Sequence, residues 1–170
     1  ALTKLSISLL AQSRKSYLAM SHNIHISVNL PCNRERAWQA IADWEGQGSW
    51  MLQSKVWVTS QIREGVGTSI AAFTGPFYKS YPKFAALGLL DTMVVTKWQP
   101  PIRCDVLHTG KVLKGTGTFE LIEISQSATR FNWSEDIECS RLQFLAIYPF
   151  LWIGVRISLA RLSTSLRPPE

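Results

Sequence analysis

Residues 128–166 read ATRFNWSEDIECSRLQFLAIYPFLWIGVRISLARLSTSL, and the spacing of their apolar side chains changes part-way along. Residues 128–138 alternate between apolar and polar, which is typical of a strand with one buried face. From Pro149 to about Leu166 the period becomes three to four, as in a helix, with an apolar stripe of Trp152, Val155, Leu159, Leu162 and Leu166. The stretch predicts a strand followed by a long helix whose stripe packs on a sheet.

The residues before this stretch predict an antiparallel meander. Residues 24–30 alternate like a half-buried strand, and Asn33 is suited to cap a short helix after it. Five further strands are expected at 51–59, 66–73, 91–98, 103–113 and 115–124, joined mostly by short turns. The longer connector, residues 75–90, is expected to cover another part of the molecule. The predicted fold class is therefore α+β, with a curved antiparallel sheet of about seven strands wrapped around a long C-terminal helix.

Length and composition indicate one folded domain with an extension. A chain of 170 residues has the size of a single domain, and 46% apolar with 18% charged residues excludes general disorder. Residues 1–20 contain no acid and are rich in serine, so we expect an N-terminal extension to a domain of residues 21–170.

The net charge of +6 is concentrated at the two ends of the chain. Residues 1–34 carry +4 and residues 140–170 carry +3, whereas residues 35–139 carry −1. Nucleic-acid binding needs clustered Lys and Arg on one face, so we expect no nucleic-acid partner. The basic ends allow weak contact with a membrane surface.

Cysteine and apolar spacing predict a cytoplasmic protein without a metal or cofactor. Cys32, Cys104 and Cys139 are widely spaced, with no CxxC pair and no paired histidines, and we interpret them as reduced thiols. The run Phe144–Val155 has twelve residues and contains Pro149, whereas a membrane span needs about 20. We interpret it as part of a core helix.

Glu135 is the acid with the most informative neighbours. It shares a strand face with Phe131, Trp133 and Ile137, so it points into an apolar space. Burial there would raise its pKa and suit it to act as a general acid or to polarise a ligand. The alternative is a structural carboxylate bonded to a neighbouring loop or strand.

His108 is the second candidate, because its face-mates include Cys104 and Val106. The alternative is a core histidine with satisfied hydrogen bonds. The strand 115–124 separates His108 from Glu135 by about 10 Å, so we expect no direct bond between them. We interpret Gly115 and Gly117 as a strand-entry turn.

Several motifs resemble, in order and spacing, the START/birch-pollen-allergen (SRPBCC) superfamily and its polyketide cyclase/dehydrase-like members. They are RAWQAIADW (36–44), VGT (66–68), DTM (91–93), WQPP (98–101), HTG (108–110) and FNWSE (131–135), and the resemblance covers about 22–166. It implies a helix-grip fold with a cavity for an apolar molecule between the sheet and the C-terminal helix. The 75–90 connector and the N-terminal extension depart from the pattern. At the family-pattern positions Asp43 and Asp91 we expect caps.

Two functional hypotheses follow. The first is binding or carrying of a hydrophobic or aromatic small molecule, lipid- or polyketide-like, whose polar end is oriented by His108 and Glu135. The alternative is a polyketide cyclase/dehydratase-type enzyme that uses Glu135 and His108 as acid and base. The predicted ligand-binding residues are Phe131, Trp133, Trp152, Val106, Phe119, Trp98 and Val155. The sequence leaves the ligand and the oligomeric state open.

Overall fold

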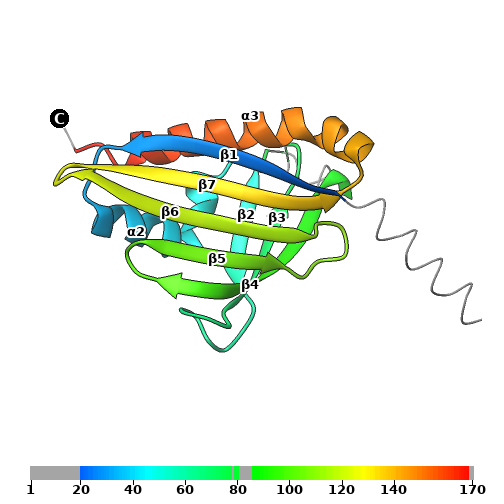
Figure 1. The fold of residues 1–170 in the computed structure, drawn as a ribbon, viewed down its shortest axis with the longest axis horizontal. Helices are drawn as coiled ribbons and strands as arrows, with labels where there is room; N and C mark the ends of the chain where they lie inside the picture. Colours follow the sequence, from blue (N-terminus) through cyan, green and yellow to red (C-terminus); the bar gives the residue numbers. More distant parts are fainter. Residues whose placement is uncertain (1–19, 78, 81–85, 169–170) are drawn as a thin grey trace, which may run out of the picture.

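The computed structural model describes residues 20–77, 79–80 and 86–168, and it has the predicted α+β architecture (Figure 1). Seven strands form one curved antiparallel sheet in the order β1-β7-β6-β5-β4-β3-β2, and α3 runs alongside β1. The elements are β1 (Met20–Leu30), α2 (Arg34–Ala42), the 3-10 turn η1 (Gly46–Ser49), β2 (Ser54–Val58), β3 (Ser69–Thr74), β4 (Leu89–Gln99), β5 (Arg103–His108), β6 (Gly115–Ser125), β7 (Ala128–Cys139) and α3 (Arg141–Ser165). The predicted extension lies outside the described residues, except that Met20 already belongs to β1.

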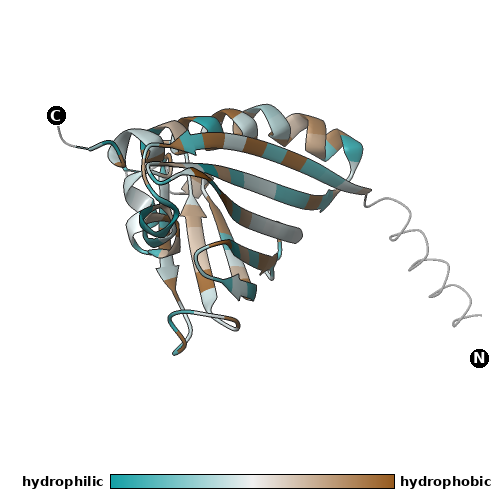
Figure 2. Cartoon of the chain, turned by 60° about the vertical axis from the view of Figure 1, so that its left-hand side comes forward, coloured by the Kyte–Doolittle hydropathy of each residue, from teal (hydrophilic) through white to brown (hydrophobic). Residues whose placement is uncertain are grey.

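Alternating burial defines the concave face of the sheet. Along β7 every second residue from Thr129 to Ile137 is buried, and β1 shows matching alternation at Ile24 and Ile26 (Figure 2). Because β1 and β7 pair antiparallel over their whole length, the buried residues of both strands lie on the same face. The period-two pattern in the sequence thus predicts the inner face correctly.

The short helix α2 confirms the expected capping. The Asn33 side chain accepts a hydrogen bond from the backbone N–H of Arg36, and Ala37, Trp38 and Ile41 are buried on one side. The helix ends at Asp43, whose carboxylate accepts a bond from the N–H of Gly46. Asp43 is therefore a cap, as predicted.

The C-terminal helix starts earlier than predicted. Ser140 and Gln143 form a capping box, so α3 begins at Arg141, and Pro149 lies inside the helix instead of opening it. Proline lacks the N–H that would bond to the carbonyl of Leu145, and Leu145 is exposed at that turn. The Ser-x-x-Gln pattern at 140–143 is the sequence signal that locates the true start.

The second half of α3 is buried against the sheet, whereas the first half contacts the core only through half-buried side chains such as Phe144 and Leu151. Leu159, Leu162 and Leu166 are buried as predicted, but Trp152 is 38% exposed. The interpretation of Phe144–Val155 as a core helix is wrong, because most of that half of α3 is exposed. Apolar residues occupy both sides of this half, so their spacing alone does not choose the side that meets the sheet.

The packing of α3 predicts a sharp contrast between two leucines of the same helix. Leu162 is fully buried, so Leu162→Ala should lower the free energy of unfolding by about 2–5 kcal/mol through lost contacts and a cavity. Leu142 is 80% exposed, and Leu142→Ala should change it by less than about 0.5 kcal/mol. Urea denaturation of both variants measures the difference. Equal losses would contradict the assigned packing.

Candidate functional site

Three titratable side chains form a hydrogen-bonded row on the concave face. His108 Nδ1 lies 2.7 Å from Oδ2 of Asp91, and His108 Nε2 lies 2.7 Å from Oε2 of Glu135. The three residues come from β4, β5 and β7, and all three are buried. The expectation that His108 and Glu135 would not bond directly is therefore wrong. We call these residues the Asp91–His108–Glu135 cluster.

Glycine in β6 explains how His108 and Glu135 meet across an intervening strand. Gly117 stands in register with Val106 on β5 and with Glu135 on β7. A β-carbon at position 117 would lie 2.8 Å from Oε1 of Glu135 and 3.0 Å from Cγ2 of Val106. The missing side chain leaves the space through which the Glu135 carboxylate crosses β6 to reach His108.

Gly115 does serve at strand entry, as predicted, whereas Gly117 has this different role. Gly115 is the first residue of β6 and has a φ of 125°, which residues other than glycine rarely adopt. A β-carbon there would collide with the carbonyl oxygen of Asp136 on β7. Gly115 thus allows β6 to pair closely with the backbone of β7, whereas Gly117 leaves space for the Glu135 side chain.

Asp91 is the member of the cluster that sequence reasoning missed. It was expected to be a cap, but its side chain is buried against His108. Met93 pairs with His108 across β4 and β5, so Asp91, two residues before Met93, lies diagonally opposite the imidazole. Its second oxygen, Oδ1, is buried without a hydrogen-bond partner among the described residues. That oxygen is an unsatisfied acceptor inside the site.

The cluster perturbs the proton affinities of its members. Burial by itself lowers the pKa of His108, but hydrogen bonds to Asp91 and Glu135, together with their charges, raise it to about 9. Burial raises the pKa of Glu135, and the hydrogen bond and charge of His108 offset this only in part. When one proton lies between Asp91 and His108 and a second lies between His108 and Glu135, the cluster carries a single negative charge. The proton between Nε2 and Oε2 can sit on either atom without changing that charge.

The apolar surroundings contain some of the predicted ligand-binding residues. Val106, Phe131 and Trp133 are buried on the concave face with the cluster. Phe119 of β6 meets Phe131 edge-on, with ring centroids 5.5 Å apart. These four residues form an apolar wall along β5, β6 and β7.

The other predicted wall residues have different neighbours. Trp98 packs edge-on against Trp38, at 4.9 Å between centroids, and it pairs with Cys104, four residues along β5 from His108. It belongs to an aromatic group beside α2. Trp152 lies partly exposed on α3 under the guanidinium of Arg156, and Val155 packs half-buried against the core.

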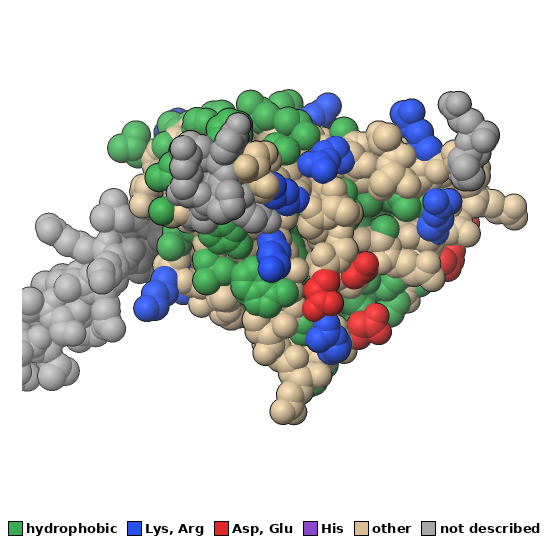
Figure 3. All heavy atoms as spheres, turned by 180° about the vertical axis from the view of Figure 1, so that it is seen from behind, with side chains coloured by type: hydrophobic (Ala, Val, Ile, Leu, Met, Phe, Trp, Pro, Cys, Tyr) green, Lys and Arg blue, Asp and Glu red, His purple; other side chains and the backbone are tan. Residues whose placement is uncertain are grey.

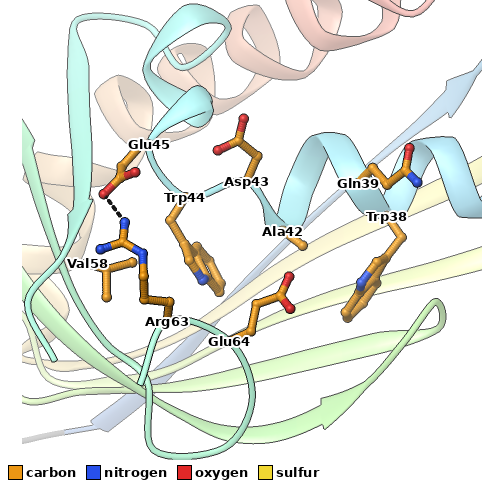
Figure 4. A pocket seen from close by; sticks show the side chains of 9 residues that line it. All are labelled: Trp38, Gln39, Ala42, Asp43, Trp44, Glu45, Val58, Arg63 and Glu64. Carbon is orange, nitrogen blue, oxygen red and sulfur yellow. Dashed lines mark hydrogen bonds and ion pairs between the residues drawn. The ribbon is translucent and has the colours of Figure 1, made fainter. Parts of the chain in front are cut away.

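Two clefts on the described surface lie apart from the cluster. One, of about 380 Å³, is lined by Trp38, Gln39, Ala42, Asp43, Trp44, Glu45, Val58, Arg63 and Glu64 (Figure 4). The other, of about 530 Å³, is lined by Ser49, Trp50, Ile157, Ala160, Arg161, Thr164 and Ser165. Neither lining includes a residue of the cluster. Within the described residues no group of three or more His, Cys, Asp or Glu side chains is arranged to hold a metal ion.

Comparison with known proteins establishes the fold. No family model matches the chain, and no curated protein is detectably similar to it. A START superfamily protein from Mycobacterium smegmatis superposes with a TM-score of 0.68 at 10% identity, over 86% of this chain and 99% of that one. The chain has a START-like helix-grip fold.

Two further structures support the assignment of a START-like domain. TTHA0849 from Thermus thermophilus gives a TM-score of 0.65 at 14% identity, over 85% of this chain and 97% of that one. The Aha1 dimer from Colwellia psychrerythraea gives 0.61 at 17% identity, over 85% and 96%. At these identities the likeness concerns the fold, and the START-like domain takes its function from its own residues.

The glycine gap in β6 predicts a specific effect on His108. The added methyl group of Gly117→Ala would displace the Glu135 carboxylate, so the pKa of His108 should fall from about 9 toward 6.5. NMR titration of the His108 ring protons measures this. Gly154→Ala is the control, because a β-carbon at position 154 meets no atom within 4 Å. An unchanged His108 titration in Gly117→Ala would contradict the proposed path.

The cluster also predicts the pH dependence of stability. His108 has a higher pKa in the folded chain than the ordinary 6.5, so its stabilising contribution is complete below pH 6.5 and is lost as pH rises through about 9. The raised pKa of Glu135 acts in the same direction, because here too the folded state binds more protons than the unfolded state.

We therefore expect the free energy of unfolding to fall between pH 6.5 and about 9, with His108 contributing on the order of 3 kcal/mol. Glu135→Gln removes one carboxylate from His108 and should flatten this slope. Glu138→Gln, an exposed position on the same strand, should leave the slope unchanged. Chemical denaturation across the pH range decides, and a flat wild-type curve would refute the assignment.

Proposed function

We propose that the protein binds an apolar small molecule, lipid- or polyketide-like, against the concave face of its sheet. In this proposal the Asp91–His108–Glu135 cluster holds a polar group of that molecule. The supporting observation is Oδ1 of Asp91, a buried acceptor without a partner among the described residues. Leaving such an atom unpaired costs about 1–3 kcal/mol, so a ligand hydroxyl or N–H that bonds to it gains affinity there.

The apolar wall supplies the rest of the proposed binding energy. Phe119, Phe131 and Trp133 lie buried or half-buried beside the cluster, and in this proposal a ligand that enters the concave face packs against their rings. A ligand with an aromatic or alkyl body and one hydroxyl donor would satisfy both features. The free cysteines, Cys32, Cys104 and Cys139, fit the proposed cytoplasmic setting.

One observation favours the alternative, a cyclase/dehydratase-type enzyme. His108 Nε2 and Glu135 Oε2 lie 2.7 Å apart and form an acid–base pair in which either atom can carry the shared proton. The side chain of Glu135 is 11% exposed and that of His108 only 2%. Glu135 would therefore meet the substrate, and His108 would act through it as a positioning residue. We place binding first because it needs one hydrogen bond to the cluster, whereas catalysis needs both an acid and a base that reach the substrate, and the His108 side chain is only 2% exposed.

The binding proposal is tested with β-naphthol and its methyl ether, two probes that differ in the hydroxyl donor. Wild-type protein should bind β-naphthol about tenfold more tightly, or about 1.4 kcal/mol, measured by probe fluorescence. Asp91→Asn should abolish that preference. Equal affinity of the wild type for both probes would contradict a ligand bond at Asp91.

Glu135→Gln then separates binding from catalysis. Under the binding proposal it should keep β-naphthol affinity within about tenfold and flatten its pH dependence. Under the enzyme alternative, wild-type protein should also release water from a linear β-polyketone as it cyclises, detected by mass spectrometry. Glu135→Gln should slow that reaction by about 10²–10⁴. Glu138→Gln is the matched control, and turnover unaffected by Glu135→Gln would exclude Glu135 as the acid or base.

A further inference from the structure

The outward side of α3 is apolar along its first half. Leu142, Leu145, Ala146, Phe150 and Ile153 recur at spacings of three and four, so they share one side of the helix. All five are exposed, and Leu142 and Phe150 each reach 80%. We call these residues the apolar outer stripe. Figure 3 shows hydrophobic side chains gathered along the edge of the molecule where α3 lies.

The charged side chains that α3 itself carries are all basic. Arg141 stands at its start, and Arg156, Arg161 and Arg167 follow it along α3 and just beyond. Residues 140–169 contain no Asp or Glu. In Figure 3 blue side chains lie among the green ones along this edge, whereas the red side chains lie lower on the molecule. The surface is therefore both apolar and cationic.

A cleft at the far end of the helix adds a second cationic feature. The cleft of about 530 Å³ is lined by Ile157 and Arg161, and the Arg161 guanidinium donates to the carbonyl of Ser49. Burial lowers the pKa of Lys79, and the charge of the neighbouring Arg161 lowers it further. Two neighbouring cations beside an apolar helix face suit an anionic group such as a phosphate.

The packing of α3 limits how it can meet a bilayer. It is the one described helix long and apolar enough to cross a membrane by length and composition, and 11% of its most apolar window is buried. Its opposite side, however, is fixed to the domain through Leu159 and Leu162. Arg156 also falls within this window. This combination fits a helix that lies in the plane of the interface.

Charge decides between a membrane and a second copy of the chain. In a two-fold contact through the stripe, the arginines of both copies would approach each other with no acid on either helix to pair with them. Anionic lipid headgroups provide the missing negative charge. We propose that α3 docks on an anionic bilayer, with the apolar outer stripe among the acyl chains and the arginines at the headgroups. This proposal does not depend on the ligand site.

Vesicle sedimentation of the full chain tests the proposal. Binding should be strong to phosphatidylcholine vesicles that contain phosphatidylglycerol, weak to phosphatidylcholine alone, and reduced by salt. The double variant Leu142→Ser/Phe150→Ser should bind at least about tenfold less. Arg141→Gln and Arg167→Gln should each weaken binding about fivefold. The control Val66→Ser/Ile124→Ser removes two exposed apolar side chains from other surfaces and should bind as the wild type does.

Three results would overturn the proposal. If Leu142→Ser/Phe150→Ser bound vesicles as well as the wild type, the basic ends of the chain alone would account for the binding and the apolar outer stripe would have no part in it. Equal binding to neutral and anionic vesicles would remove the role of the arginines. A dimer in sedimentation velocity that Leu142→Ser/Phe150→Ser abolishes, without vesicle binding by the wild type, would assign the stripe to a second copy. Because Leu142 and Phe150 are mostly exposed, all variants should keep the wild-type circular dichroism spectrum.

Discussion

Glu135 and His108 lie two strands apart in the sheet, and a carboxylate reaches an imidazole over that separation only where the strand between them has no side chain. Two strand spacings amount to about 10 Å, yet the facing atoms are 2.7 Å apart because the Glu135 carboxylate extends over Gly117. Any larger residue at 117 would fill the path. The site thus depends on a position that carries no functional group, and the adjacent strands can stay paired in normal register around it.

The cluster is costly in a START-like domain of this size. Carboxylates and an imidazole removed from water repay their desolvation only through close hydrogen bonds, and apolar replacements of buried ionic groups are often neutral or stabilising. His108 is bonded at both ring nitrogens, but Oδ1 of Asp91 is left over among the described residues. A purely structural row would gain by pairing that atom within the chain. The unpaired acceptor is the reason why we propose that the cluster binds a ligand.

Local patterns predicted the fold well and the site only in part. Alternation along 128–138 placed Glu135 among Phe131 and Trp133, as observed. The hydrogen bond between Glu135 and His108 was not predicted because strand spacing alone puts the two residues about 10 Å apart. That estimate did not take into account that Gly117, on the strand between them, has no side chain. Asp91 was missed because its place depends on the register of β4 against β5, and β4 follows a long connector from which no register can be counted. Ser140 and Gln143 form a capping-box pattern that predicts the start of α3 at Arg141. The helix was instead predicted to start at Pro149, because proline is common in the first turn of helices.

The two proposed surfaces meet at one end of the molecule. Glu135 lies four residues before the end of β7 at Cys139, and the exposed half of α3 begins two residues after that end, at Arg141. Phe144 in the first turns of α3 stacks on His22, at 4.3 Å between centroids, and His22 pairs with Ile137, two residues from Glu135. The face of α3 opposite Phe144 is the apolar outer stripe. A helix that rests on a bilayer in this position would bring the cluster end of the sheet toward the lipid, which is where a carrier of apolar molecules would need its binding site.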